Sequence, residues 1–141
     1  MSRIVTISSF HASKLGNDRD IYVYLPEGYE ENRQERYPVL YLQDGQNVFD
    51  NGKSVSGRSW RINRVADRLI EEKQIRKIIM VAIPSMNRSI EYGYYTWKNK
   101  RVRWANGAGF DFSIEGRGEE YADFVINQLK PFIDEHYRTL P

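Results

Sequence analysis

The spacing of hydrophobic and polar residues predicts β-strands near the start of this chain. Residues 4–8 form one strand-like run, and residues 21–25 form another. In the second run Ile21, Val23 and Leu25 occupy alternate positions, as expected for a strand with one apolar face. We therefore expect the first part of the chain to contribute two strands to a sheet.

Two unbroken apolar runs, residues 39–42 and 78–83, are typical of parallel strands whose faces are both covered by helices. Between them, apolar residues fall at helical spacing on one face: Ile62, Val65, Ala66, Leu69 and Ile70. A parallel crossover needs a dozen or more residues, and residues 37–83 have the size of one such strand-helix-strand unit. The predicted fold class is α/β.

The last third of the chain predicts an aromatic loop and then a helix. Residues 84–118 show no clear periodicity, and we expect a long loop there, of a kind that is usually functional or mobile. One helical face is then marked by Tyr121, Phe124, Val125, Leu129, Phe132, Ile133 and Tyr137. Pro131 either kinks or restarts this helix, or serves as a first-turn residue.

Length and composition predict one domain over residues 1–141, since 40% of the residues are hydrophobic. The net charge of +2 is too small to indicate a nucleic-acid partner or an anionic membrane. The absence of cysteine excludes disulfides and thiolate chemistry and suits a reducing compartment. We expect a cytoplasmic protein, because the start also lacks the apolar run of a signal peptide and no stretch is long enough to span a membrane.

Residues 37–50, with the sequence Tyr-Pro-Val-Leu-Tyr-Leu-Gln-Asp-Gly-Gln-Asn-Val-Phe-Asp, resemble the loop after the third strand in an esterase branch of the α/β-hydrolases. That branch includes esterase D-like, enterochelin-esterase-like and feruloyl-esterase-like enzymes. The similarity covers nearly the whole chain, through residues 21–29, 60–69, 79–83 and 129–139. It implies the N-terminal half of an α/β-hydrolase fold, a mostly parallel sheet with flanking helices.

The resemblance also implies a role for Asp44-Gly45-Gln46. Hydrolases of this kind need backbone N–H groups aimed at the oxyanion of a tetrahedral intermediate. In the family the residue after the glycine supplies one of them, so the Gln46 amide is the first candidate for an oxyanion hole. Gly45 leaves room for the chain to turn. Asp44 and Gly45 are predicted to line the substrate site, and the Asp44 and Gln46 side chains are weaker candidates for contacts with a polar substrate. Taken alone, Asp-Gly is a common turn.

The chain departs from the family at the nucleophile. The G-x-S-x-G elbow is missing, because residues 52–56, Gly-Lys-Ser-Val-Ser, lack the closing glycine. The serine, acid and histidine of the triad are therefore expected outside residues 1–141. The resemblance predicts a serine carboxylic-ester hydrolase. We expect this chain alone to be catalytically inactive. A Gln46 nitrogen held in a helix, or facing away from the carboxyl ends of the strands, would contradict the oxyanion assignment.

Other candidate chemistry is weak. His136 at a helix end is expected to be structural, and His11 to lie on the surface. Asp44, Gln46 and Asp50 lack the ligand pattern of a calcium loop, and a zinc site has neither a His pair nor Cys. No cofactor and no metal are implied.

Two further predictions concern binding. In the family the segment around Trp97 and Trp104 borders the active-site mouth, so these side chains could bind substrate, and the alternative is that they serve as lid or core packing. If the strand that neighbours residues 37–43 in the family is missing, that edge is open to a second copy or a complementing chain. The rival function is a non-catalytic binding or assembly protein, for example one that grips carbohydrate. No nucleic acid or membrane partner is expected.

Overall fold

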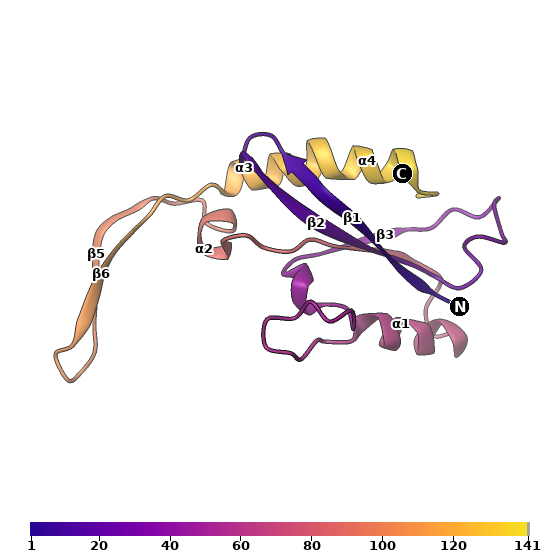
Figure 1. The fold of residues 1–141 in the computed structure, drawn as a ribbon, viewed down its shortest axis with the longest axis horizontal. Coiled ribbons are helices and arrows are strands. Elements are labelled where there is room, and N and C mark those ends of the chain that lie inside the picture. Colours follow the sequence, from indigo (N-terminus) through magenta and orange to yellow (C-terminus); the bar gives the residue numbers. More distant parts are fainter. Residues whose placement is uncertain (141) are drawn as a thin grey trace.

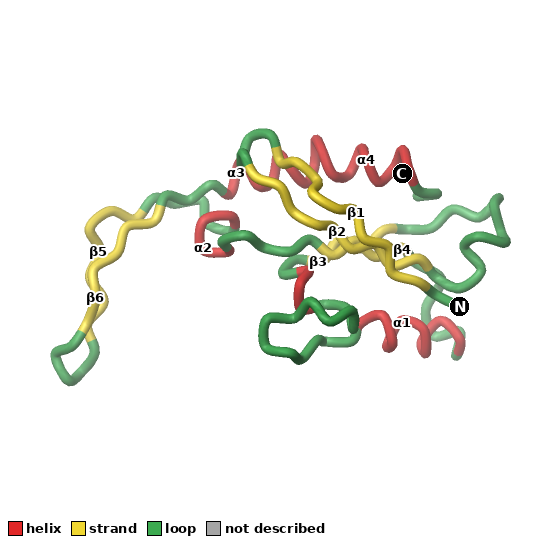
Figure 2. The backbone as a smooth tube through the Cα atoms, viewed as in Figure 1, coloured by secondary structure: helices red, strands yellow, loops and turns green. Residues whose placement is uncertain are grey.

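The computed structural model describes residues 1–140, and its main body is a four-stranded sheet enclosed by helices (Figure 1). The strands of this sheet are β1 (Arg3–Ala12), β2 (Asn17–Leu25), β3 (Val39–Leu42) and β4 (Ile79–Ala82). One face is covered by the helix formed from α3 (Gly118–Asp123), η2 (Phe124–Leu129) and α4 (Lys130–His136), and the other by α1 (Ile62–Glu71). Figure 2 shows the sheet between these two helical layers.

The sheet has the strand order β1-β2-β4-β3 and is mixed. The pair β3–β4 is parallel, as expected from the strand-helix-strand unit, whereas β1–β2 and β2–β4 are antiparallel. The expectation of a mostly parallel sheet is therefore wrong for this part of the chain. Only four residues separate β1 from β2, and so short a link can join only antiparallel neighbours.

The alternation predicted for β2 divides its side chains between the two helical layers. Ile21, Val23 and Leu25 are buried toward α3–α4, while Tyr22 and Tyr24 are buried toward α1. The central strand β4 is buried along its whole length. Both helices predicted from periodicity are therefore confirmed, and each covers the sheet face that its apolar stripe required.

Pro131 lies inside a continuous helical stretch rather than in a break. The preceding six residues, η2, form a π-helix, in which the Lys130 N–H donates to the carbonyl of Val125. A π-helical segment changes the local hydrogen-bond register, and α4 restarts with Pro131 in its first turn, where a missing N–H costs little. Both sequence expectations for Pro131 thus describe part of what the helix does.

The segment expected to be one long aromatic loop is largely ordered. It contains the one-turn helix α2 (Arg88–Glu91) and an antiparallel hairpin of β5 (Trp97–Arg103) and β6 (Gly109–Ile114). This hairpin, which we call the arm, stands away from the body (Figure 1). The loop prediction was wrong because charged residues interrupt the alternation in β5. The turn dipeptide Asn106-Gly107 was the available signal for a hairpin.

Residues 138–140 pair with the outer edge of the sheet just before β3 begins. Tyr37, just before β3, forms a parallel bridge with Thr139. The Tyr37 N–H donates to the Arg138 carbonyl at 2.9 Å, and the Leu140 N–H donates to the Tyr37 carbonyl at 2.8 Å. Within residues 1–140 no strand pairs with the rest of β3 on this side, and Leu40 is 46% exposed.

Candidate functional site

The turn after β3 is pressed against the end of β4. The Gly45 N–H donates to the Ile83 carbonyl at 2.8 Å. A Cβ on Gly45 would lie 2.4 Å from the Ile83 nitrogen and 2.5 Å from the Ala82 carbonyl carbon. Only glycine fits there, and the left-handed residue of the turn is its neighbour Asp44, with φ of 50°. This contact fixes the turn at the carboxyl ends of the parallel pair.

Gln46 lies in a one-turn 3₁₀ helix, η1 (Gly45–Asn47). A Gln46 nitrogen in a helix is the placement that the sequence prediction ruled out, and the structure contradicts the prediction on this point. That prediction made no allowance for the start of a helix. The first N–H groups of a helical turn have no partner within the turn, however. Among residues 1–140 the Gln46 N–H has no hydrogen-bond acceptor, while those of Gly45 and Asn47 do. The amide is therefore free to bind an external acceptor.

The Gln46 side chain ties this turn to the loop that leaves β4. Its Nε2 donates to Ser85 Oγ at 3.1 Å, and its Oε1 accepts from the Ser85 N–H at 3.1 Å. A two-way contact of this kind restricts the side chain to one orientation. The Gln46 side chain is thus engaged within the protein, whereas the Gln46 backbone N–H has no acceptor among residues 1–140.

Asp44 contacts Arg88 of α2 and Tyr92, the residue that follows α2. Its carboxylate, 14% exposed, lies 3.0 Å from Arg88 Nη2. The Tyr92 hydroxyl accepts from the Asp44 N–H at 3.2 Å and donates to Asp44 Oδ1 at 3.3 Å. Burial, with the nearby Asp44 charge, raises the pKa of Tyr92, so its hydroxyl keeps the donated proton at neutral pH. Arg88 offsets the negative charge of this carboxylate.

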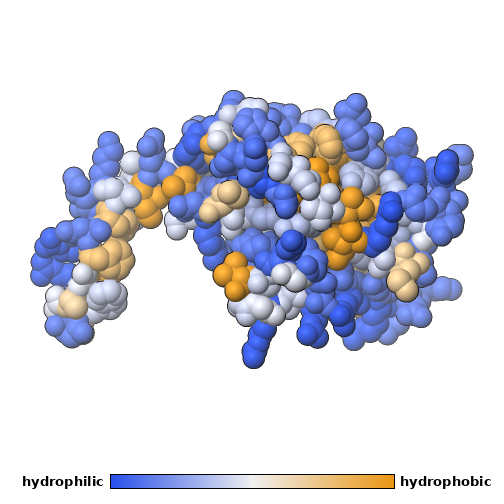
Figure 3. All heavy atoms as spheres, in the orientation of Figure 1, coloured by the Kyte–Doolittle hydropathy of each residue, from blue (hydrophilic) through white to orange (hydrophobic). Residues whose placement is uncertain are grey.

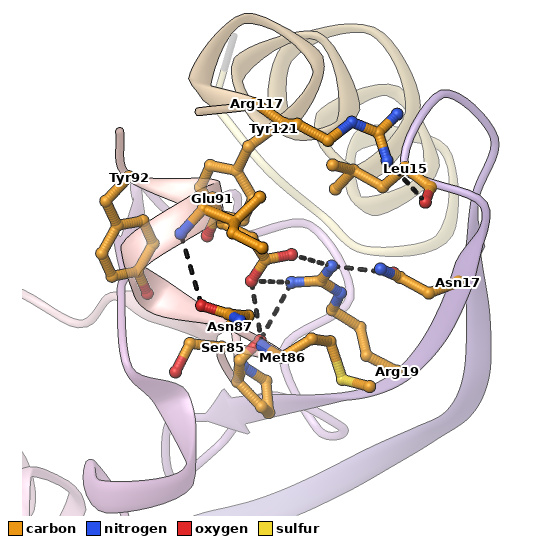
Figure 4. Close-up of polar contacts among 12 residues, drawn as sticks. Leu15, Asn17, Arg19, Ser85, Met86, Asn87, Glu91, Tyr92, Arg117 and Tyr121 are labelled. Atoms are coloured by element: carbon orange, nitrogen blue, oxygen red, sulfur yellow. Dashed lines mark hydrogen bonds and ion pairs between the residues drawn. The ribbon is translucent and has the colours of Figure 1, made fainter. Parts of the chain in front are cut away.

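A buried ion pair joins α2 to β2 (Figure 4). Arg19 of β2 and Glu91 of α2 are 1% and 3% exposed, and the two groups form two hydrogen bonds. Sequence reasoning missed this pair. The available signal was the register of β2, since Arg19 has the same parity as the inward-facing Ile21 and Val23.

The two predicted substrate-binding tryptophans lie on the arm and not beside Gln46 (Figure 1). Trp97, at the start of β5, is 49% exposed and lines an open hollow of about 720 Å³ with Lys100 and Glu115. Trp104, next to the arm's turn, is 56% exposed and packs against Phe110. Neither is a core residue. Within the described residues the structure joins Asp44, Gly45 and Gln46 in one place and leaves both tryptophans apart from them.

The two histidines have ordinary surroundings. His136 stacks on Phe132, with ring centroids 4.0 Å apart, at the end of α4. His11 is exposed and pairs with Asp18 across the β1–β2 hairpin. Within residues 1–140 no three His, Asp or Glu side chains group closely enough to hold a metal ion. None of the described helices is long and apolar enough to cross a bilayer.

Comparison with known proteins identifies the family of this chain. Residues 12–141 match the family described as putative esterase. The chain belongs to this esterase family. Its similar proteins include an endo-1,4-beta-xylanase/feruloyl esterase of Xylanibacter ruminicola, which is 28% identical over 135 residues, 93% of this chain and 16% of that protein.

Solved structures agree on the fold. An IroE-like serine hydrolase of Shewanella oneidensis has a TM-score of 0.66 and 25% identity, and the match covers 99% of this chain and 40% of that one. A ferulic acid esterase has a TM-score of 0.61 and 24% identity, with 99% and 46% covered. The chain thus spans less than half the length of each protein named here. Its fold is part of an α/β-hydrolase-type esterase fold, and its family and neighbours are esterase-type hydrolases.

Proposed function

We propose that this chain provides the oxyanion-loop half of a serine carboxylic-ester hydrolase. The observation that carries the proposal is the Gln46 amide: a backbone N–H without an internal acceptor, at the carboxyl ends of β3 and β4. In open α/β sheets, ligands bind outside the carboxyl ends of the strands. Preorganised N–H donors at such a place stabilise the negative charge of an acyl-transfer transition state.

The chemistry of the family is acyl transfer: a serine oxygen attacks the ester carbonyl, an acyl-enzyme forms as the alcohol leaves, and water then releases the acid. In this chain Gln46 donates its backbone N–H to the carbonyl oxygen as that oxygen becomes an anion. Gly45 and the Ser85 contact hold the donor in place before the substrate arrives. Rigid placement removes the cost of reorganisation at the moment of reaction.

The serine, acid and histidine belong outside residues 1–141 in this proposal, since the sequence holds no G-x-S-x-G elbow. The chain alone is then inactive. Incubation with a fluorophosphonate probe is expected to leave the 141-residue chain unlabelled. Stoichiometric labelling of one serine would overturn this part of the proposal.

The oxyanion role is tested by two substitutions at one position. Gln46→Pro removes the backbone N–H, and proline is tolerated in the first turn of a helix. Gln46→Ala keeps that N–H and removes only the side chain. Each variant is combined with the triad-bearing half of an esterase of the same family, and hydrolysis of methyl ferulate is measured. Gln46→Pro is expected to lower kcat about 10²–10³-fold relative to Gln46→Ala, and equal rates for the two would reject the role.

The complementing half is proposed to dock at the free edge of β3. Tyr37 already pairs in parallel with residues 138–140, and Val39 and Tyr41 follow on the same edge of the strand. An apolar, unpaired edge recruits another strand, from a second copy or from a complementing chain. Sedimentation at high concentration is expected to show self-association, or a heterodimer when the complementing half is added. A monomer under both conditions would contradict the docking proposal.

A second candidate function rests on the exposed aromatic side chains of the arm. Trp97 and Trp104 could stack on a sugar or an aryl ester without any catalytic step. Xylo-oligosaccharide titration followed by tryptophan fluorescence tests this, with Trp60→Ala as the control, because Trp60 is similarly exposed, at 58%, but lies on the body. Tight binding that Trp97→Ala and Trp104→Ala abolish, without esterase complementation, would favour this function over the first.

The substrate class and compartment complete the proposal. The ferulic acid esterases among the similar proteins make feruloyl esters the first substrates to test. We place the reaction in the cytoplasm, on the composition without cysteine.

A further inference from the structure

We propose that Arg19 and Glu91 form a positioning pair for the oxyanion loop, and this inference rests on the proposed function of Gln46. The pair holds the loop that leaves β4, residues 84–86, in the place from which Ser85 fixes Gln46. Neither charged group touches the Gln46 amide itself. They act on it through the exit loop, and Figure 4 shows the ion pair beside Ser85 and Met86 of that loop.

The pair is built for contacts with the backbone rather than for stability alone. Arg19 Nη1 donates to the Pro84 carbonyl at 3.1 Å, and Glu91 Oε1 accepts from the Met86 N–H at 2.9 Å. The exit loop is thus held from both sides of Ser85. One contact needs a donor and the other an acceptor, so arginine and glutamate are not interchangeable here.

Ser85, between the two held residues, makes the two-way contact with the Gln46 side chain at 3.1 Å in each direction. The connection therefore runs from the ion pair to the exit loop and from there to the oxyanion turn. The same short helix that carries Glu91 also carries Arg88, which lies 3.0 Å from Asp44 on the other side of Gly45. Both sides of the turn depend on the placement of α2.

Stability is a poor explanation for the pair. Two charges removed from water seldom stabilise a fold more than well-packed apolar residues of the same size. Among the described residues, Arg19 Nε is buried without a hydrogen-bond partner. The guanidinium also lies against the Phe124 ring, 5.1 Å from its centroid, where an apolar side chain would pack as well. What apolar residues cannot replace is the pair of backbone contacts to the exit loop.

Hydrogen exchange of the full 141-residue chain tests the proposal. The double variant Arg19→Met/Glu91→Leu removes both charges and keeps the apolar volume, so it is expected to fold. The readout is the ratio of two amide protection factors, for Ser85, whose acceptor is Gln46 Oε1, and for Ile83, whose acceptor is the Leu42 carbonyl. Neither acceptor is altered by the substitutions. A purely structural role lowers both protection factors together, whereas the positioning role lowers the Ser85 to Ile83 ratio at least tenfold.

Arg19→Lys is the second variant and keeps the proposal testable if the double variant does not fold. Lysine retains the charge opposite Glu91, but its single ammonium cannot reproduce all the bonds of the guanidinium fork. We expect the Ser85 to Ile83 ratio to fall at least threefold. An unchanged ratio in either folded variant would overturn the positioning role. This outcome is independent of Gln46→Pro, since a failed oxyanion role leaves amide exchange at Ser85 unaffected.

Discussion

Two arginine–carboxylate pairs of this protein have the same fork-like chemistry in opposite surroundings. In the body, Arg19 and Glu91 are 1% and 3% exposed. On the arm, Arg101 and Asp111 are 55% and 61% exposed, with Arg101 Nη2 at 2.9 Å from the carboxylate. The first pair is surrounded by backbone groups and aromatic rings, and the second links the two strands of the arm, which projects from the body in the space-filling view (Figure 3). The two pairs therefore have the same chemistry and differ in their burial.

Burial makes the body pair costly to break, because a remaining partner keeps its charge away from water. Exposure makes the arm pair nearly neutral, since water and salt replace either partner. The same difference extends to the two regions. The body buries apolar side chains on both faces of its sheet, whereas the arm is a two-stranded hairpin with Trp97, Trp104 and Phe110 about half exposed. Hairpins of this kind are marginally stable by themselves.

The largest expected effect is at Arg19. Arg19→Met alone leaves the Glu91 carboxylate buried without its partner, and the free energy of unfolding should fall by about 3–5 kcal/mol. Urea unfolding followed by circular dichroism measures the loss. The double variant with Glu91→Leu is the control and should recover most of it. A single variant as stable as wild type would show that the site is wetter than its burial indicates.

Gly45→Ala should have the next largest effect, since its Cβ would lie 2.4 Å from the Ile83 nitrogen. The backbone must shift, and we expect a loss of about 1–3 kcal/mol in the free energy of unfolding. The matched variant on the arm is Gly107→Ala. There φ is +83° but no atom lies within 4 Å, so strain stays local and the midpoint of the body is unchanged. Equal effects of the two variants on the body would contradict the contact with β4.

High pH should weaken the body through Tyr92. Burial raises the pKa of Tyr92, so the folded chain holds the phenol proton more tightly than the unfolded chain. This contribution is complete below the unfolded pKa of about 10 and is lost as pH rises through the higher folded pKa.

Tyr92→Phe should therefore lose about 1 kcal/mol at neutral pH, from its bonds with Asp44. Its stability should then fall less steeply than that of wild type above pH 10. Urea midpoints of the two proteins at pH 8, 10 and 11 test this expectation. Parallel pH profiles would show that the Tyr92 proton does not contribute to the pH dependence of stability.

The smallest effect is expected on the arm. Asp111→Asn removes the exposed partner of Arg101 and should leave the urea midpoint of the body unchanged at physiological salt. Amide exchange within β5 and β6 should be faster than in β4 for both proteins. A clear loss of body stability in this variant would mean that the arm is coupled to the sheet.

The body was largely predictable because its apolar residues repeat at simple periods. The two-residue period of Ile21, Val23 and Leu25 and the helical period of residues 62–70 each reflect one buried face. The arm was missed since neither of its faces is buried, so nothing constrains a clean alternation in β5. The turn dipeptide Asn106-Gly107 is nevertheless visible in the sequence, because a tight turn depends on local backbone conformation and not on burial.

The candidate site divides in the same way. The sequence alone determined that Asp44-Gly45-Gln46 follows a buried strand, and that no serine elbow accompanies it. Only the tertiary structure decided that Gly45 lies against Ile83, that Ser85 holds Gln46, and that Arg19 reaches Glu91 across 72 positions of the chain. Periodicity records which faces are buried, because burial acts on each residue separately. Which polar groups meet inside is a property of pairs distant in sequence, and only packing brings them together.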